Sequence, residues 1–134
     1  MEAQAIHHVG VAVEDLDAAV ATYERLFGGR LEHRERVEDQ GVEAASIRLG
    51  ESRVELLAAL GEDTPVGKFL AKRGPGMHHI AYAVPDVGAA LADLQAAGAE
   101  LIDKAPRRGM FGLEVAFLHP ESVHGVLSEV VSDG

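Results

Sequence analysis

The 134-residue chain contains no cysteine and no tryptophan, and aromatic residues make up only 4% of it. The absence of cysteine excludes disulfides, thiolate metal sites and a cysteine nucleophile. The core must therefore be built mainly from the aliphatic residues that dominate the 47% hydrophobic content. No run approaches the roughly 18 consecutive apolar residues of a membrane span, and the N-terminus lacks the basic flank of a signal peptide. We expect a cytoplasmic protein without a membrane partner.

Positive charge is also scarce, because 12 Lys and Arg residues stand against 22 Asp and Glu residues, for a formal net charge of -10. Such a chain repels nucleic acid, since a nucleic-acid site needs a basic patch to offset the phosphates. We therefore expect no nucleic-acid partner. To bind an anionic small molecule, the chain would need a metal ion or a few Lys and Arg side chains at the site to offset its negative charge.

An internal repeat organises the sequence. Residues 6–16, IHHVGVAVEDL, align without gaps with residues 77–87, MHHIAYAVPDV, so that residue 8 matches residue 79, an offset of 79 − 8 = 71. Each copy begins with a β-rich run that ends at an Asp and is followed by apolar residues at helical spacing. We predict a strand, an N-cap at Asp15 or Asp86, and then a helix in each copy.

The rest of each copy is read from the same kind of pattern. The first helix is predicted to end at Gly28-Gly29 and the second near Gly98. Their packed faces would be Leu16, Val20, Tyr23 and Phe27 in the first helix, and Val87, Leu91 and Leu94 in the second. Short strands are expected over residues 30–38, 42–49 and 52–60, and again over residues 100–104, 113–118 and 125–132.

These elements predict an α+β fold in a single domain over residues 1–134. Two tandem βαβββ modules, at about residues 1–60 and 76–134, would be joined by a linker over about residues 61–75 that holds a short helix at residues 66–70. The strands of both modules would form a cup-shaped, mostly antiparallel sheet with the helices on its outer face.

Two adjacent histidines stand at the same place in each copy, His7-His8 and His78-His79. Neighbouring residues of a strand point to opposite faces, so the two histidines of a pair cannot do the same job. His8 and His79 share a face with small residues, which leave volume for a ligand, whereas the other face is bulky enough for a helix to pack on. We predict that His8 and His79 are metal ligands and that His7 and His78 are not. The small residues on the ligand face are Gly10, Ala12, Ala81 and Ala83.

A glutamate stands in an apolar run near the end of each copy, Glu55 and Glu129, and the two are 129 − 55 = 74 residues apart, close to the repeat offset. An ionised carboxylate is costly to bury unless an opposite charge compensates it. These glutamates are therefore predicted to complete the metal site. Two imidazoles and two carboxylates suit a divalent Co, Mn, Ni, Zn or Fe ion, and they leave two octahedral positions open for substrate oxygens.

The combination of motifs resembles the vicinal oxygen chelate superfamily, the glyoxalase and dioxygenase group, and within it the methylmalonyl-CoA epimerase family. The resemblance covers essentially the whole chain. Carried over position by position, the family's metal ligands fall on His8, Glu55, His79 and Glu129, although some members have Gln in place of Glu55. The segments that carry the resemblance are HHVGVAV at residues 7–13, GEDTP at 61–65, KFL at 68–70, GMHHI at 76–80, FLHP at 117–120 and GVLSE at 125–129.

The resemblance implies one bound divalent ion, expected to be Co2+, with Mn2+, Ni2+ or Zn2+ as alternatives. It also implies an epimerase that interconverts (2R)- and (2S)-methylmalonyl-CoA by moving the C2 proton through an enolate that the metal would stabilise. Such a 1,1-proton transfer needs acid/base groups on both faces of C2. Glu43 is predicted to serve one face because it shares strand parity with Ala45 and Ile47; in some family members the acidic residue falls one position later, at Ala44 here. Glu129 or a bound water would serve the other face.

The phosphates of CoA would need cations in this acidic chain. The candidates lie in loop-like segments, with two glycines where backbone N–H groups could approach the ligand closely: Lys68, Lys104, Arg107, Arg108, Gly109 and Gly112. The resemblance further implies a homodimer and a place in propionate metabolism. Two rival functions remain open, namely a glyoxalase I-type isomerase with the same ligands and a metal-free small-molecule binding protein of the same fold.

Overall fold

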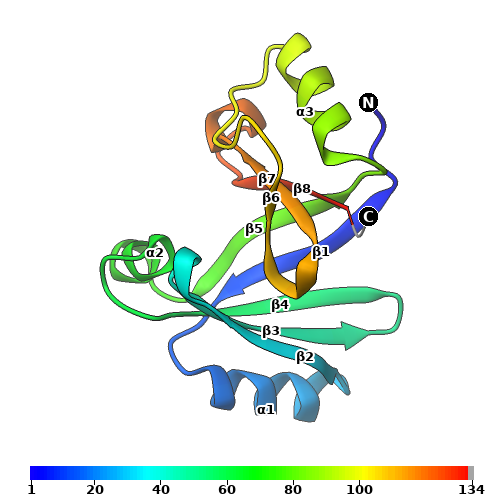
Figure 1. The fold of residues 1–134 in the computed structure, drawn as a ribbon. Coiled ribbons are helices and arrows are strands. Elements are labelled where there is room, and N and C mark those ends of the chain that lie inside the picture. Colours follow the sequence, from blue (N-terminus) through cyan, green and yellow to red (C-terminus); the bar gives the residue numbers. More distant parts are fainter. Residues whose placement is uncertain (133–134) are drawn as a thin grey trace. The chain divides into compact units, whose positions relative to one another are not determined.

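The computed structural model describes residues 1–132. Within them the chain forms eight β-strands, three α-helices and three short 3-10 helices (Figure 1). The described residues divide into two compact units, one formed by His8–His78 and the other by Met1–His7 together with residues 79–132, so β1 and β5 each contribute residues to both. No helix within residues 1–132 is long and apolar enough to cross a membrane.

The unit His8–His78 holds the first βαβββ module and the helix that follows it. Its strands lie in the order β2-β3-β4-β1. Strand β1 runs parallel to β4, while β2, β3 and β4 pair antiparallel. The elements are β1 (Ala5–Ala12), α1 (Leu16–Phe27), β2 (Arg30–Val37), η1 (Glu38–Gln40), β3 (Val42–Leu49), β4 (Ser52–Ala59) and α2 (Pro65–Arg73).

Helix α1 begins and ends where the sequence predicts. The Asp15 side chain accepts a hydrogen bond from the Ala18 N–H, and Gly28 closes the helix in the left-handed conformation at φ 65°; a glycine adopts that conformation without a steric penalty. One face of the helix packs on β3 and β4, through a cluster formed by Leu16, Val20, Ala45, Ile47 and Leu56. Phe27 lies on the same face as predicted, with its ring against Tyr23, but it is 63% exposed and adds little to the packing.

The other unit holds the second module. Its strands lie in the order β5-β8-β7-β6, with β5 parallel to β8 and the other neighbours antiparallel. Asp86 caps its helix by accepting from the Ala89 N–H, and the helix packs on β7 and β8 through Val87 and Leu91. The elements are β5 (Gly76–Ala83), α3 (Val87–Ala96), β6 (Arg107–Arg108), η2 (Met110–Gly112), β7 (Glu114–Leu118), η3 (Pro120–Val123) and β8 (Ser128–Ser132).

The strand predicted over residues 100–104 is wrong. This segment forms only an isolated bridge between Leu101 and Leu118. The N–H groups of Ile102 and Asp103 both donate to the Phe117 carbonyl, and the Asp103 carboxylate accepts from the Phe117 N–H. A side chain therefore takes the place of the backbone partner that a ladder would need, and regular pairing resumes only in the two-residue β6.

The α+β class and the two βαβββ modules are confirmed, since each module runs strand, helix and three strands. The linker helix is longer than expected. Helix α2 covers Pro65–Arg73, begins with a proline in its first turn, and is capped by the Thr64 hydroxyl, which accepts from the Gly67 N–H. Proline suits this position because its missing N–H would have no helical partner there.

Candidate metal centre

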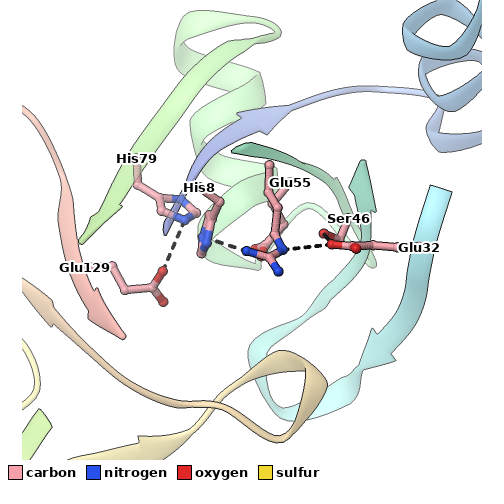
Figure 2. Close-up of polar contacts among 7 residues, drawn as sticks. His8, Glu32, Ser46, Glu55, His79 and Glu129 are labelled. Carbon is pink, nitrogen blue, oxygen red and sulfur yellow. Dashed lines mark hydrogen bonds and ion pairs between the residues drawn. The ribbon is translucent and has the colours of Figure 1, made fainter. Parts of the chain in front are cut away.

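In the first unit, a buried histidine faces a buried glutamate across two parallel strands. Gly10 of β1 pairs with Glu55 of β4, and His8 lies two residues before Gly10, on the same face of β1. The His8 Nε2 lies 3.4 Å from the Glu55 Oε2, and the two side chains are only 4% and 6% exposed (Figure 2). The fold thus brings together two of the predicted ligands.

The second unit repeats this arrangement. Ala81 of β5 pairs with Glu129 of the parallel strand β8, and His79 lies two residues before Ala81. The His79 Nε2 lies 3.5 Å from the Glu129 Oε1, with side chains 3% and 7% exposed (Figure 2). The edge of the Phe117 ring packs against the imidazole of His79, with centroids 5.5 Å apart. Each module therefore offers one buried imidazole and one buried carboxylate at equivalent positions.

The neighbouring histidines have different surroundings. His7 and His78 are half-buried, whereas His8 and His79 are buried. The ring of His78 packs edge-on against Phe69 of α2, with centroids 5.0 Å apart. This burial agrees with the strand parity argument, while metal binding by His8 and His79 stays a prediction.

Three polar side chains that the sequence analysis missed lie on the same sheet face as Glu55. Ser46 of β3 is the cross-strand partner of Glu55, and its hydroxyl donates to the Glu32 Oε1 at 3.2 Å. The Arg53 Nε donates to the same oxygen at 2.8 Å. Glu32 is the extra residue of a β-bulge, because Leu31 pairs with Ile47 and His33 pairs with Ser46, so Glu32 and His33 both stand opposite Ser46.

The electrostatics of Glu32 follow from its two donors. Burial by itself would raise the pKa of the Glu32 carboxyl. The hydrogen bond and charge of Arg53, the hydrogen bond from Ser46 and the charge of Arg48 outweigh burial, so the pKa is held below its usual value. Glu32 is therefore an ionised hydrogen-bond acceptor at neutral pH.

Glu43 lies elsewhere than the proton-transfer prediction requires. Successive residues of β3 alternate between faces, so Glu43 lies opposite the face of Ser46 and Glu55. Its own face carries Ala45, which packs in the cluster beneath α1. The Glu43 carboxylate accepts from the Arg34 Nε at 3.0 Å, and hydrogen bonds from Arg34 to Asp17 and Glu43 raise the pKa of Arg34. The register therefore does not support Glu43 as a group beside Glu55, and Ala44 is the residue that faces that side.

The predicted CoA contacts lie at several places. Lys68 lies in α2, and Lys104 is exposed in the segment before β6. The guanidinium of Arg107 already has partners within the chain. Its Nε lies 3.3 Å from the Asp103 carboxylate, and it lies over the Phe117 ring.

The two glycines predicted to admit a ligand differ. A Cβ on Gly109 would lie 2.8 Å from a Val115 methyl group, so glycine is needed there for packing against β7. Gly112 has φ 73° and no neighbour closer than 3.6 Å to a built Cβ, so its backbone conformation is what requires glycine.

Comparison with known proteins places this chain in a family. Residues 7–117 match the Glyoxalase/Bleomycin resistance protein/Dioxygenase superfamily. The chain belongs to this superfamily. An ethylmalonyl-CoA/methylmalonyl-CoA epimerase of Cereibacter sphaeroides is a member 39% identical over 127 residues, which cover 93% of this chain and 95% of that protein. The family resemblance predicted from the motifs is thereby confirmed.

Solved structures of this superfamily agree over almost the whole chain. A methylmalonyl-CoA epimerase in complex with methylmalonyl-CoA and NH4+ superposes with a TM-score of 0.94 at 42% identity, over 98% of this chain and 95% of that one. A methylmalonyl-CoA epimerase from Mycobacterium tuberculosis superposes with a TM-score of 0.95 at 36% identity, over 98% and 89% of the two chains. The vicinal oxygen chelate fold predicted for this chain is confirmed.

Proposed function

We propose that this protein is a metal-dependent epimerase that interconverts (2R)- and (2S)-methylmalonyl-CoA. Relatives that align along nearly its whole length carry this activity in their names, and a structural neighbour at 42% identity holds methylmalonyl-CoA. The observation that carries the proposal is the duplicated buried pair, His8 with Glu55 and His79 with Glu129.

The donor set fits a divalent ion. His8, His79 and Glu129 are buried side chains of the types that can together hold a metal, and Glu55 adds a second carboxylate. Two imidazoles with two carboxylates suit borderline ions, so we propose Co2+, with Mn2+, Ni2+ or Zn2+ as alternatives. When bound, the ion would supply a Lewis acid for the negative charge that develops as C2 loses its proton.

The protein's own residues must hold the substrate and move the proton. Glu129 is the proposed acid/base group for one face of C2, because a carboxylate that offers one oxygen to a metal keeps the other for a proton. A water held in the site is proposed for the opposite face. Glu43 was the sequence-based candidate, but its position on the α1 side of β3 leaves that role without structural support.

The remaining assignments stay predictions. Lys68, Lys104 and Arg108 are proposed to bind the phosphates of CoA, while Arg107 would first have to leave Asp103. A homodimer, a cytoplasmic location and a role in propionate metabolism rest on the family resemblance.

Isotope exchange tests the proposal directly. Protein loaded with Co2+ is incubated with (2R)- or (2S)-methylmalonyl-CoA in deuterated water, and deuterium at C2 is followed by mass spectrometry. We expect label in both substrates and interconversion of the two epimers. An absence of exchange with Co2+, Mn2+, Ni2+ and Zn2+ would overturn the proposal, and turnover of a glutathione hemithioacetal in its place would favour a glyoxalase I-type isomerase.

A further inference from the structure

The proposed reaction leaves unexplained a polar cluster on strands β2, β3 and β4 of the first module, formed by Glu32, Ser46 and Arg53. Arg53 lies two residues before Glu55 on β4, so both side chains project from the same face. Ser46 is the cross-strand partner of Glu55, and its hydroxyl donates to Glu32, which therefore reaches the same face. The cluster therefore adjoins a proposed metal ligand along one strand (Figure 2).

The hydrogen bonds of the cluster fix the guanidinium and leave part of it available. One oxygen of Glu32, Oε1, accepts from both the Ser46 hydroxyl at 3.2 Å and the Arg53 Nε at 2.8 Å. Within residues 1–132, Nε is the only nitrogen of the Arg53 guanidinium for which a hydrogen bond or ion pair is found. A guanidinium presents its donors as a rigid fork that matches a carboxylate. With Nε held, the two terminal nitrogens can bind a second anion.

Burial and charge favour an anionic ligand at this position. Ser46, which donates a hydrogen bond to Glu32, is only 3% exposed. The Arg53 side chain is 32% exposed, so a solute can reach it. Arg48 is the cross-strand partner of Arg53. Arg48 therefore adds a second guanidinium on the face of Arg53, in a chain whose overall charge of -10 otherwise repels anions.

We infer that the terminal nitrogens of Arg53 bind the free carboxylate of the substrate, and that Glu32 and Ser46 hold the guanidinium in position for it. This inference rests on the proposed function and identifies the residue that would select its substrates. A residue two positions along a strand lies about 6.6 Å away, so a carboxylate on Arg53 lies beside Glu55. Arg53 is thus a substrate-binding residue that selects malonyl-type thioesters, with a second carboxylate, over acyl-CoA esters without one. Glu32 is a positioning residue.

The first test measures dicarboxylate binding without turnover. Calorimetric titration of the metal-loaded protein with methylmalonate, which carries no CoA, gives a dissociation constant for the wild type, R53Q and R53K. We expect R53Q to weaken binding about 10- to 150-fold, the equivalent of a charge-assisted hydrogen bond, and R53K to restore only part of it because an ammonium lacks the fork. Equal affinity in the wild type and R53Q would overturn the inference.

Arg36 offers a matched control. It is also a strand arginine whose Nε donates to a glutamate, Glu38, at 2.6 Å, but strand parity with Arg34 places it on the opposite face from Glu32's cluster. R36Q should bind methylmalonate as the wild type does. An equal loss in R36Q and R53Q would mean that the effect is general electrostatics, and the inference would fail.

The second test separates positioning by Glu32 from a structural role. A Gln at position 32 keeps an oxygen that accepts both hydrogen bonds, whereas an Ala removes it. We expect E32A to raise KM for methylmalonyl-CoA about tenfold or more, while E32Q stays within about threefold of the wild type, with thermal stability measured alongside. If E32A and E32Q have the same KM as the wild type, Glu32 does not position Arg53.

The two proposals fail in different ways. If the wild type binds methylmalonate through Arg53 but exchanges no C2 proton, the epimerase proposal fails and the dicarboxylate site stands. If exchange is normal and R53Q keeps the wild-type affinity and KM, the epimerase proposal stands and the inference about Arg53 fails.

Discussion

Replacing His79 by alanine should greatly weaken metal binding, whereas replacing the adjacent His78 should leave it intact. The two residues are neighbours on β5 and lose the same side chain, so the comparison isolates the face to which each imidazole points. His79 is 3% exposed and its Nε2 lies 3.5 Å from the Glu129 carboxylate. The imidazole of His78 packs edge-on against Phe69, and strand alternation places it on the face opposite to the predicted ligand His79.

The expected size of the effect follows from ligand linkage. An ion at about 1,000 times its dissociation constant stabilises the folded protein by about 4.1 kcal/mol. At about 3–6 °C per kcal/mol for a chain of this length, the melting temperature of the wild type should rise by about 12–25 °C. Loss of a residue that hydrogen-bonds to a metal ligand already costs metal sites about 10- to 100-fold in affinity, so loss of His79, a proposed ligand, should cost about 1,000-fold. The same ion concentration would then stabilise H79A by about 0.4 kcal/mol, or about 1–2 °C.

Differential scanning calorimetry with and without Co2+ measures this shift within each variant. Both substitutions also alter the metal-free protein, because H79A leaves a cavity beside a buried carboxylate and H78A loses an aromatic contact of about 0.5–1.5 kcal/mol. Each variant is compared with itself with and without Co2+, so these costs are present in both measurements and cancel in the difference. If H78A loses the shift and H79A keeps it, the assignment of faces from strand parity is refuted, and H8A with H7A repeats the test in the first module.

Two further predictions concern carboxylates of the first module. Glu43 lies on the α1 side of β3 and pairs with Arg34. E43Q should therefore keep its metal-induced rise in melting temperature and a kcat within about threefold of the wild type. A fall in kcat of about 100-fold or more, the size of a lost acid/base contribution, would restore Glu43 as a proton-transfer group. Folding lowers the pKa of the Glu32 carboxyl from the usual value of 4.5. The ionised carboxylate therefore stabilises the folded protein at any pH above that usual value. This stabilisation is lost as the pH falls through the lower pKa of the folded state. Urea unfolding of the wild type and E32Q from pH 7 to pH 3 should show the wild-type advantage disappearing below about pH 4.5, and an unchanged difference across that range would contradict the prediction.

The sequence was a good guide wherever a repeated pattern decided the structure. Asp15 and Asp86 cap their helices as predicted, because N-capping depends on a few local residues. The burial of His8 and His79 followed from strand alternation, which has a fixed period of two. Glu55 and Glu129 were found because buried carboxylates in apolar runs are costly without a role.

Other features depend on contacts that no local pattern reveals. The segment at residues 100–104 has strand-like composition, but the Asp103 carboxylate takes the Phe117 N–H that a ladder would use. Glu43 shares its strand face with Ala45, which packs beneath α1; an apolar strand face can lie beneath a helix as well as face a ligand, and the role of Glu43 in proton transfer stays a prediction. Glu32 was missed because only contacts between strands join it to the cluster, where its carboxylate accepts hydrogen bonds from Ser46 and Arg53.

The duplicated pair is better explained by function than by stability. A buried ion pair gives little net stabilisation, because desolvation of both charges offsets their attraction, and well-packed apolar residues in its place are often neutral or stabilising. Here the arrangement occurs twice, with a histidine on the first strand of each module and a glutamate on the parallel last strand, at separations of 3.4 and 3.5 Å. Strand alternation would let an aliphatic residue occupy any of the four positions. The occurrence of a buried imidazole and a buried carboxylate at equivalent places in both modules therefore supports the proposal that these four side chains are donors to a divalent metal ion.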